Sequence, residues 1–277
     1  MSDLTGIVLG LDEQLYHSHD SLSSTGARKL LESPARFHYA QQHPQAPKAA
    51  FDLGTAAHTK ILGVGAGVVA YPDEHLTKSG NVSTKAETVA WAEEQRNAGL
   101  TPISPDDVAA VDAMAESVLA HPVARALLEQ EGEAEASVFA TDPETGVEVR
   151  ARFDYLANVC VDLKSSRKEV SPARFARTVA EFGYEVQEGF YTDALEMVTG
   201  ERRDMVFIVF ETAPPYLVAV HQLDRDFRDM GRVKARRARE LFAECTASGV
   251  WPGYPTEISL VVPPMYAIYD FQDRYES

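Results

Sequence analysis

Cysteine is scarce, basic residues are outnumbered and long apolar runs are missing, and each of these absences excludes a class of protein. Only two residues are cysteines, Cys160 and Cys245, and they form no CxxC motif, which excludes a thiolate zinc site and a disulfide framework. Such sparing use of cysteine fits a reducing compartment. No apolar stretch approaches the roughly 20 residues of a membrane span, and the first residues lack the basic start and apolar core of a signal peptide. We therefore expect a cytoplasmic protein with no membrane partner.

The charge balance is strongly acidic, with 26 Lys and Arg against 42 Asp and Glu and a formal net charge of −16. This excludes a uniformly basic protein that coats nucleic acid, but it leaves room for a local basic surface. Hydrophobic residues make up 45% and charged residues 25% of the 277 residues, a mixture that can bury a sizeable core. No repeat of solenoid length occurs, so we expect one elaborated domain over residues 1–277.

Hydrophobic periodicity predicts a helical part over residues 1–130 and a mixed part over 131–277. In the first part we expect helices at 26–32, with Ser23 and Ser24 as possible caps, from 34 onward, and at 49–62, 84–97 and 105–128. In the second part the spacing predicts strands at 134–140, 147–156, 159–164, 205–211 and 216–222, and helices at 172–181, 183–199 and 225–247. The first three strands should form two successive hairpins. This order indicates an α/β fold of three layers, α/β/α, with a central mixed sheet and an added N-terminal helical region.

Two acidic residues and a lysine on neighbouring strands carry the strongest chemical signal. Asp162 and Lys164 point to one face of their predicted strand because side chains alternate, and pairing about the turn at 157–158 can bring Asp154 beside them. Buried acids are costly unless they are paired or bind a metal, and oxygen ligands of this kind suit Mg²⁺ or Mn²⁺. A ladder of surface salt bridges across the strands is the alternative interpretation.

Three further motifs bear on this cluster, and each also has an ordinary structural interpretation. His58 lies on the apolar face of a predicted helix, where a histidine is usually a hydrogen-bonded core residue. Glu135 lies in a predicted strand, where an isolated glutamate is more often solvated. One predicted helix carries a polar and aromatic stripe of Tyr184, Gln187 and Tyr191 at helical spacing, which also suits the edge of a core.

The predicted helix at 225–247 carries a stripe of arginines at spacings of 3 and 4, namely Arg225, Arg228, Arg232, Arg236 and Arg239. Arginine pairs well with phosphate without reading base sequence. The stripe is therefore either an edge that follows a DNA backbone or a solvated charged face. Six more basic residues lie near the carboxylate cluster in the sequence: Arg150, Arg152, Arg167, Lys168, Arg174 and Arg177.

Taken together and in this order, the motifs resemble the PD-(D/E)xK nuclease superfamily, its RecB-type branch and, within that branch, the RecE-like exonuclease VIII domain of phages and prophages. The motifs that carry the resemblance are Gly54-xxx-His58, Phe153-Asp154, Asp162-Leu-Lys164 and Gln187-xxx-Tyr191. The resemblance covers nearly the whole chain, although Phe153 stands where the superfamily has a proline. It implies a restriction-endonuclease-like core.

The resemblance also implies a role for each residue of the site. The metal ligands would be His58, Asp154, Asp162 and the main-chain carbonyl of Leu163. Lys164 would orient or help deprotonate the attacking water, and Glu135 would be an accessory acid. Gln187 and Tyr191 would brace the site or touch DNA. A terminal phosphate would be held by Ser24, Arg28 and Arg36, and further DNA contacts would come from Arg150, Arg152, Arg232 and Arg236.

The implied activity is that of a Mg²⁺-dependent exodeoxyribonuclease, with Mn²⁺ as a plausible substitute. It would act 5′→3′ on double-stranded DNA ends and leave 3′ single-stranded tails for recombination. A ring-shaped homo-oligomer and a single-strand annealing protein as partner are further implications, and an acidic outer wall of such a ring would discourage non-specific DNA adsorption. Three alternatives stay open: a single-strand or structure-specific nuclease, an inactive scaffold that binds DNA or a recombination partner, and a structural protein without a nucleic-acid role.

Overall fold

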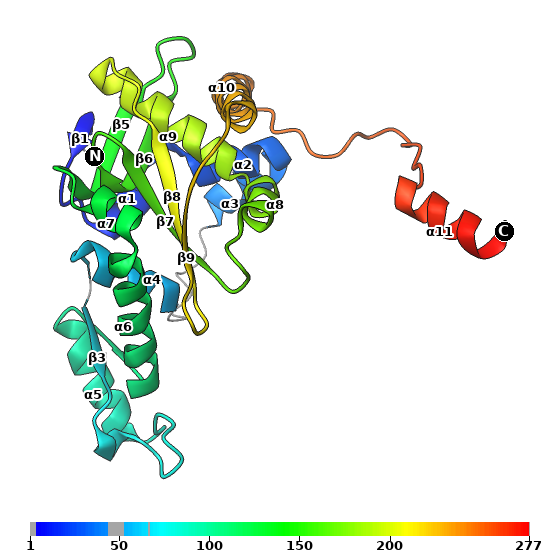
Figure 1. The fold of residues 1–277 in the computed structure, drawn as a ribbon. Helices are drawn as coiled ribbons and strands as arrows, with labels where there is room; N and C mark the ends of the chain where they lie inside the picture. The colour runs from blue at the N-terminus through cyan, green and yellow to red at the C-terminus, as the bar shows by residue number, and fades with distance from the viewer. Residues whose placement is uncertain (1–3, 44–52, 66, 277) are drawn as a thin grey trace.

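A central mixed sheet organises the fold in the computed structural model, which describes residues 4–43, 53–65 and 67–276 (Figure 1). The strand order is β1-β5-β6-β7-β8-β9, and β2 pairs with β6. The strands are β1 (Gly6–Val8), β2 (Leu22–Ser23), β5 (Glu133–Thr141), β6 (Glu148–Leu156), β7 (Cys160–Ser166), β8 (Met205–Glu211) and β9 (Val218–Gln222). β5, β6 and β7 pair antiparallel, β7 and β8 run parallel, and β8 and β9 run antiparallel. The predicted hairpins and mixed sheet are thus confirmed.

Helices cover both faces of this sheet and give the three predicted layers (Figure 1). One layer contains α2 (Ser24–Glu32), α3 (Pro34–Gln42), α8 (Pro172–Phe182), α9 (Tyr184–Thr199) and α10 (Arg225–Ser248). The other contains α4 (Leu53–Leu62), α6 (Pro105–Ala120) and α7 (Pro122–Leu128). In β8, Phe207 packs into the core under the first layer and Ile208 into the core under the second. A strand covered on both faces is expected to be apolar throughout, as β8 is from Met205 to Phe210.

Local chemistry sets the helix boundaries. The Ser104 hydroxyl accepts a hydrogen bond from the backbone N–H of Asp107 at 3.1 Å and caps α6. The predicted helix over 105–128 is divided at His121, which is extended with ψ of 117°, because the proline that follows it disfavours helical backbone. The predicted helix over 49–62 is α4 from residue 53 onward, and its residues 49–52 lie outside the described part.

The sequence pattern does not predict the short strands of the first part of the chain. β1 and β2 join the main sheet, whereas β3 (Gly67–Ala70) and β4 (Leu100–Ile103) pair in parallel as a separate sheet. The remaining elements before β5 are α1 (Glu13–Ser18), η1 (Asp73–His75) and α5 (Ala86–Asn97). β3, β4, η1 and α5 form a small lobe in which Trp91 packs against Tyr71 and His75. Strands this short give no usable alternation of polar and apolar residues.

A close crossing of α9 and α10 fixes the position of α9 over the sheet. Gly189 and Gly231 meet at this crossing, where a Cβ atom on Gly189 would lie 2.7 Å from the carbonyl carbon of Gly231. Real Cβ contacts are never this short, so only glycine allows the two backbones to approach so closely. The crossing therefore holds α9, which carries Gln187 and Tyr191, at a set height above β7.

The C-terminal segment leaves the body after α10. Residues 250–264 are without helix or strand, and α11 (Met265–Tyr275) has no buried residue. Figure 1 shows α11 standing clear of the sheet and its helical layers. Among the described residues, no helix combines the length and apolar character that crossing a membrane requires.

Candidate active site

Asp154 lies in the opening between β6 and β7. The two strands pair at Tyr155 and Val161, and farther along the backbone N–H of Leu163 donates to Oδ2 of Asp154 at 2.6 Å. The Asp154 carboxylate thus accepts the hydrogen bond that a main-chain carbonyl of the neighbouring strand would accept in a regular antiparallel pair. Simple alternation predicts Asp154 on one sheet face with Asp162 and Lys164, but the structure places its carboxylate against the neighbouring strand instead.

Asp162 points from β7 toward the α9 layer and is 3% exposed. Gln187 of α9 donates from Nε2 to its Oδ1 at 2.6 Å, and the Lys164 ammonium forms an ion pair with its Oδ2. Asp162 and Lys164 therefore share a sheet face, as the period of the strand predicts. Gln187 orients the acid through a buried hydrogen bond, so its carboxylate has little freedom to rotate.

His58 reaches the same place from the opposite helical layer. Its Nδ1 lies 3.9 Å from Oδ2 of Asp154, and its ring packs edge-on against Phe210 with the centroids 5.7 Å apart. Gly54 and Ala57 of α4 are buried, and their small size lets the helix lie close to the sheet. The opening beside Asp154 thus connects residues from both sides of the sheet.

Glu135 is held toward this opening by an unusual backbone. The β5–β6 register places it opposite Asp154, between the pairs Ala134↔Tyr155 and Ala136↔Phe153, and its φ is +52°. A residue with a side chain pays about 1–2 kcal/mol for left-handed backbone. Burial, helped by the charge of Asp154, raises the pKa of Glu135 to about 7 against the opposing charge of Arg152. Strain of this kind is concentrated at functional sites.

Burial and mutual charge set the protonation of the three central groups. Burial raises the pKa of Asp154 and of Asp162 although Lys164 opposes the shift in both. Burial alone would lower the pKa of Lys164, but the two carboxylates outweigh it and the pKa is raised. Lys164 is therefore an ammonium ion at neutral pH.

Two tyrosines of α9 complete the surroundings of the cluster. The Tyr184 ring lies 4.9 Å from the Lys164 ammonium and forms a cation–π contact. Tyr191 is 9% exposed, packs edge-on against Phe153, and shares a hydrogen bond with Ser24. Sequence reasoning finds Tyr184 only as a member of a stripe and assigns it no role. Its contact with Lys164 depends on a strand 20 residues away in the chain.

The two carboxylates, Asp154 and Asp162, fit a hard divalent cation because they supply oxygen ligands. His58 adds an imidazole, a softer donor than a carboxylate oxygen. Burial raises the pKa of both acids, and Asp154 further raises that of Asp162, so a cation beside them would keep both ionised. In the part of the chain that the structure describes, no three His, Cys, Asp or Glu side chains already surround one point, because the Lys164 ammonium holds Asp162 and the Leu163 N–H holds Asp154.

Comparison with known proteins agrees with this geometry. Residues 23–261 match the family described as the PDDEXK-like domain of unknown function, DUF3799. The chain belongs to this PDDEXK-like family. No curated protein shows significant similarity to it.

One solved structure supports the same fold for this PDDEXK-like chain. A candidate exonuclease from Eubacterium rectale aligns over 94% of this chain and 98% of that chain, with a TM-score of 0.57 and 11% identity. At this identity the likeness shows a shared fold and no more. Rai1 of Scheffersomyces stipitis, in complex with 3′-NADP⁺ and calcium, covers 90% of this chain and 76% of that chain with 13% identity, but its TM-score of 0.26 carries no argument.

The burial of Arg150 and Arg152 in this PDDEXK-like fold corrects the expectation that they contact DNA. Arg150 is 8% exposed, and its guanidinium donates to the carbonyl oxygen of Ser21. The Arg152 side chain is 12% exposed and donates to the carbonyl of Leu11 at 2.8 Å. Both guanidinium groups also lie over the Tyr16 ring. They fasten the N-terminal segment to the sheet, which leaves Arg150 no exposed surface for a phosphate.

The residues expected at a terminal phosphate are separated by the structure. Ser24 is 4% exposed and bonded to Tyr191, which corrects the expectation that its hydroxyl is open to a ligand. Arg36 binds Glu32 at 2.8 Å and the Tyr254 hydroxyl at 3.0 Å, so it anchors the C-terminal segment. Arg28 also lies beside the cluster, since its charge lowers the pKa of Tyr184, and unlike Ser24 it is only half-buried.

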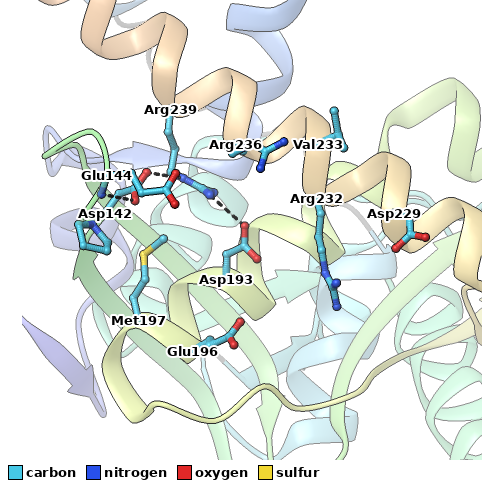
Figure 2. A pocket seen from close by; sticks show the side chains of 11 residues that line it. Asp142, Glu144, Asp193, Glu196, Met197, Asp229, Arg232, Val233, Arg236 and Arg239 are labelled. Atoms are coloured by element: carbon cyan, nitrogen blue, oxygen red, sulfur yellow. Dashed lines mark hydrogen bonds and ion pairs between the residues drawn. The ribbon is translucent and has the colours of Figure 1, made fainter.

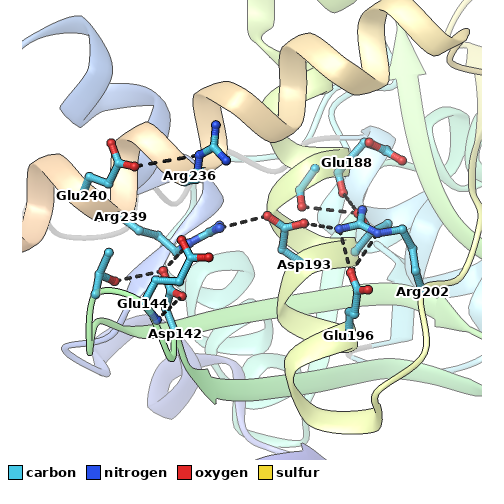
Figure 3. Close-up of polar contacts among 12 residues, drawn as sticks. Asp142, Glu144, Glu188, Asp193, Glu196, Arg202, Arg236, Arg239 and Glu240 are labelled. Carbon is cyan, nitrogen blue, oxygen red and sulfur yellow. Dashed lines mark hydrogen bonds and ion pairs between the residues drawn. The ribbon is translucent and has the colours of Figure 1, made fainter.

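The arginine stripe of α10 is not continuous. Arg239 is 6% exposed and pairs with Asp142 at 2.8 Å and Asp193 at 3.0 Å (Figure 2). A second arginine, Arg202, pairs with Asp193 and Glu196 and continues this network along α9 (Figure 3). The predicted stripe of five exposed arginines is therefore wrong at Arg239, which is a buried structural residue.

Arg232 and Arg236 remain exposed, but their surroundings are acidic. They line a pocket of about 600 Å³ together with Arg239 and the five carboxylates of Asp142, Glu144, Asp193, Glu196 and Asp229 (Figure 2). This pocket lies between α9 and α10, whereas Gln187 faces the sheet on the other side of α9. The excess of carboxylates weakens the attraction of this surface for phosphate.

Proposed function

We propose that this protein is a metal-dependent nuclease that degrades double-stranded DNA from its ends. The observation that carries the proposal is the convergence of Asp154, Asp162 and Lys164, with Gln187 bonded to Asp162. Membership of the PDDEXK-like family supports nuclease chemistry. A scaffold that only binds DNA has no use for two buried acids, which cost free energy unless they are paired.

Each central residue has a role that follows from its position. Asp154, Asp162, His58 and the Leu163 carbonyl would hold a divalent ion, Mg²⁺ or Mn²⁺, which supplies charge neutralisation at the phosphate and a more acidic bound water. Gln187 keeps the Asp162 carboxylate in one orientation.

Lys164 and Glu135 complete the chemistry. Because the pKa of Lys164 is raised, its ammonium would position the attacking water and stabilise negative charge on the phosphate rather than remove a proton. Tyr184 holds the ammonium from one side. Glu135, opposite Asp154 in the register, would be an accessory acid that acts through a water molecule or a second cation.

A different basic surface from the α10 stripe suits the DNA backbone. Four basic residues follow Lys164 in the chain, and among the described residues none of them forms an ion pair with a carboxylate: Arg167, Lys168, Arg174 and Arg177. The first two are exposed at the end of β7. Exposed cations without a carboxylate partner, just after the strand that carries Asp162 and Lys164, attract phosphate more strongly than arginines surrounded by acids.

Arg28 is the best-placed residue for the terminal phosphate of a DNA end. Its guanidinium donates to the Phe182 carbonyl at 2.6 Å and to the Thr25 hydroxyl at 3.1 Å, so it is already oriented. The 5′→3′ polarity and the 3′ single-stranded tails that recombination uses follow from the likeness to RecE-type enzymes, and they form part of the proposal.

Digestion of matched linear and covalently closed circular duplexes tests the proposal. We expect loss of linear DNA only, dependent on Mg²⁺ or Mn²⁺, stopped by EDTA and abolished in Asp162→Asn. Asp106→Asn, at an exposed acid of α6, is the matched control and should retain full activity. With end-labelled DNA, the label should be released from the 5′ end earlier than from the 3′ end. Cutting of the circle would contradict the dependence on ends, and absence of digestion with every metal would contradict the nuclease.

A further inference from the structure

The C-terminal segment exposes a large amount of apolar side chain. We define the arm as residues 255–275. Ile258 is 103% exposed, Leu260 90% and Val261 88%. α11 adds five more exposed large side chains: Met265, Tyr266, Tyr269, Phe271 and Tyr275. Monomeric proteins rarely expose apolar side chains in a continuous run, and such runs mark sites of association.

The arm starts from a firm anchor. Trp251 stacks on the His38 ring with the centroids 4.6 Å apart, and the backbone N–H of Ala35 donates to the Pro252 carbonyl at 3.1 Å. The Arg36 side chain binds the Tyr254 hydroxyl at 3.0 Å. The chain is therefore held as far as Tyr254 and then projects away from the body (Figure 1).

The composition of the arm suits a strand followed by an apolar helix. Residues 258–262 read Ile-Ser-Leu-Val-Val, a run that favours extended backbone. Between residues 255 and 264 the only charged side chain is Glu257. Since each exposed aromatic side chain contributes about 150–250 Å², the arm offers on the order of 1,000 Å² of surface. A stable interface needs about 800 Å² from each partner.

The same chain provides a strand edge that can receive the arm. Among the described strands, β1 and β9 end the main sheet. β9 (Val218–Gln222) has five residues, the same length as residues 258–262, whereas β1 has three. Leu217, next to this edge, is 55% exposed. An open edge strand presents unpaired backbone groups that an added strand can satisfy.

We propose that the arm docks on the β9 edge of a second copy of this chain, with residues 258–262 added as a strand and α11 packed beside it. Two copies that each carry a formal net charge of −16 repel one another. Residues 255–264 of the arm hold one charged side chain, Glu257, so this part can make contact without bringing acidic surfaces together. Each copy gives one arm and receives one, a head-to-tail contact that can close into a ring. The inference rests on the exposed arm and the open edge, independently of the nuclease.

Sedimentation velocity of the full chain tests whether the arm mediates association. We expect wild type to sediment as an oligomer of the 30.4 kDa chain, and Val261→Asp to weaken association at least tenfold. Val89→Asp, at a half-exposed valine of α5, is the matched control and should behave as wild type. A monomeric wild type, or a Val261→Asp variant that associates normally, would overturn the proposal.

Disulfide trapping between separately purified chains tests the acceptor edge. Both native cysteines are buried, so disulfides between introduced cysteines can be detected without competition from the native thiols. When residues 258–262 pair with 218–222, Ser259→Cys lies opposite Ala219→Cys if the strands run parallel and opposite His221→Cys if they run antiparallel, and it should cross-link to that cysteine. Ser259→Cys mixed with Val89→Cys is the control. If the chains form an oligomer but Ser259→Cys cross-links to neither cysteine on β9, β9 is not the acceptor. That result would leave the nuclease proposal unchanged, because the nuclease assay tests it separately.

Discussion

At the scale of single residues, Asp154 and Glu135 occupy positions that a regular hairpin would not provide. Asp154 accepts the Leu163 N–H at 2.6 Å where two strands separate. Glu135 lies opposite it with φ of +52°. Both features interrupt regular sheet pairing, and both place a carboxylate at the opening between β6 and β7. The irregular backbone is therefore part of how the site is built.

Glu135 offers a direct test of this strain. Glu135→Ala and Glu135→Gly both remove the carboxylate, but only glycine adopts positive φ freely. We expect the glycine variant to be more stable than the alanine variant by about 1 kcal/mol in denaturant unfolding, and both to lose nuclease activity. Equal stability of the two variants would show that the backbone at this position is not strained.

Glu188 predicts a pH dependence of stability. Burial raises its pKa to about 7, although Arg202, Arg228 and Arg232 oppose the shift. The unfolded chain releases this proton near pH 4.5 and the folded chain near pH 7. The folded state therefore holds more protons in that window, and stability falls as pH rises through it.

Replacing the carboxyl group by an uncharged amide should remove this loss. We expect Glu188→Gln to exceed wild type in unfolding free energy at pH 8 by up to about 3 kcal/mol, and the difference to shrink toward zero as pH falls to 4.5. Thermal melts across this range check it. A difference that does not change with pH would contradict a raised pKa.

At the scale of elements, the sequence predicts most of the core but not its irregular places. The strands of the second half and the helices α8, α9 and α10 follow from period and turn signals. Asp162 and Lys164 are placed together by strand alternation alone. The separation of β6 and β7 at Asp154 is not encoded in any local pattern. The inward turn of Arg150 depends on an N-terminal segment more than 120 residues away, which no spacing rule can find.

The α9–α10 crossing is the element contact most sensitive to a single methyl group. A Cβ on Gly231 would meet the backbone of Glu185. We expect Gly231→Ala to cost about 3 kcal/mol of unfolding free energy, as overpacking does, and to reduce activity because α9 carries Gln187. Gly253→Ala, where a Cβ would lie 3.6 Å from Ala35, is the control and should cost less than about 0.5 kcal/mol. Similar stability of both variants would refute the tight crossing.

At the scale of the whole molecule, uneven charge reconciles a net charge of −16 with DNA binding. The pocket between α9 and α10 holds five carboxylates among its arginines, so an acidic surface surrounds that side. The exposed cations that follow β7 are not paired with carboxylates among the described residues. DNA should therefore be attracted to the surface after β7 and repelled by the acidic surface between α9 and α10.

This distribution predicts which arginines matter for DNA binding. Arg167→Glu with Lys168→Glu should weaken binding of a duplex end and reduce the slope of log Kd against log salt concentration by about 2. Arg232→Glu with Arg236→Glu is the matched double variant and should change the slope by less than 1. Fluorescence anisotropy in a salt series measures both. A larger change in slope for the Arg232 and Arg236 variant than for the Arg167 and Lys168 variant would indicate that DNA binds along α10 instead.

The central claim is that Lys164 and its two carboxylates cleave phosphodiester bonds. Its most direct test is single-turnover digestion of a 5′-labelled linear duplex by Lys164→Met, with Mg²⁺ and with DNA binding measured in parallel. We predict a loss of at least about 100-fold in cleavage with binding within about twofold of wild type, while Lys78→Met, an exposed lysine of the small lobe, cleaves normally. Cleavage by Lys164→Met within tenfold of wild type would contradict the account.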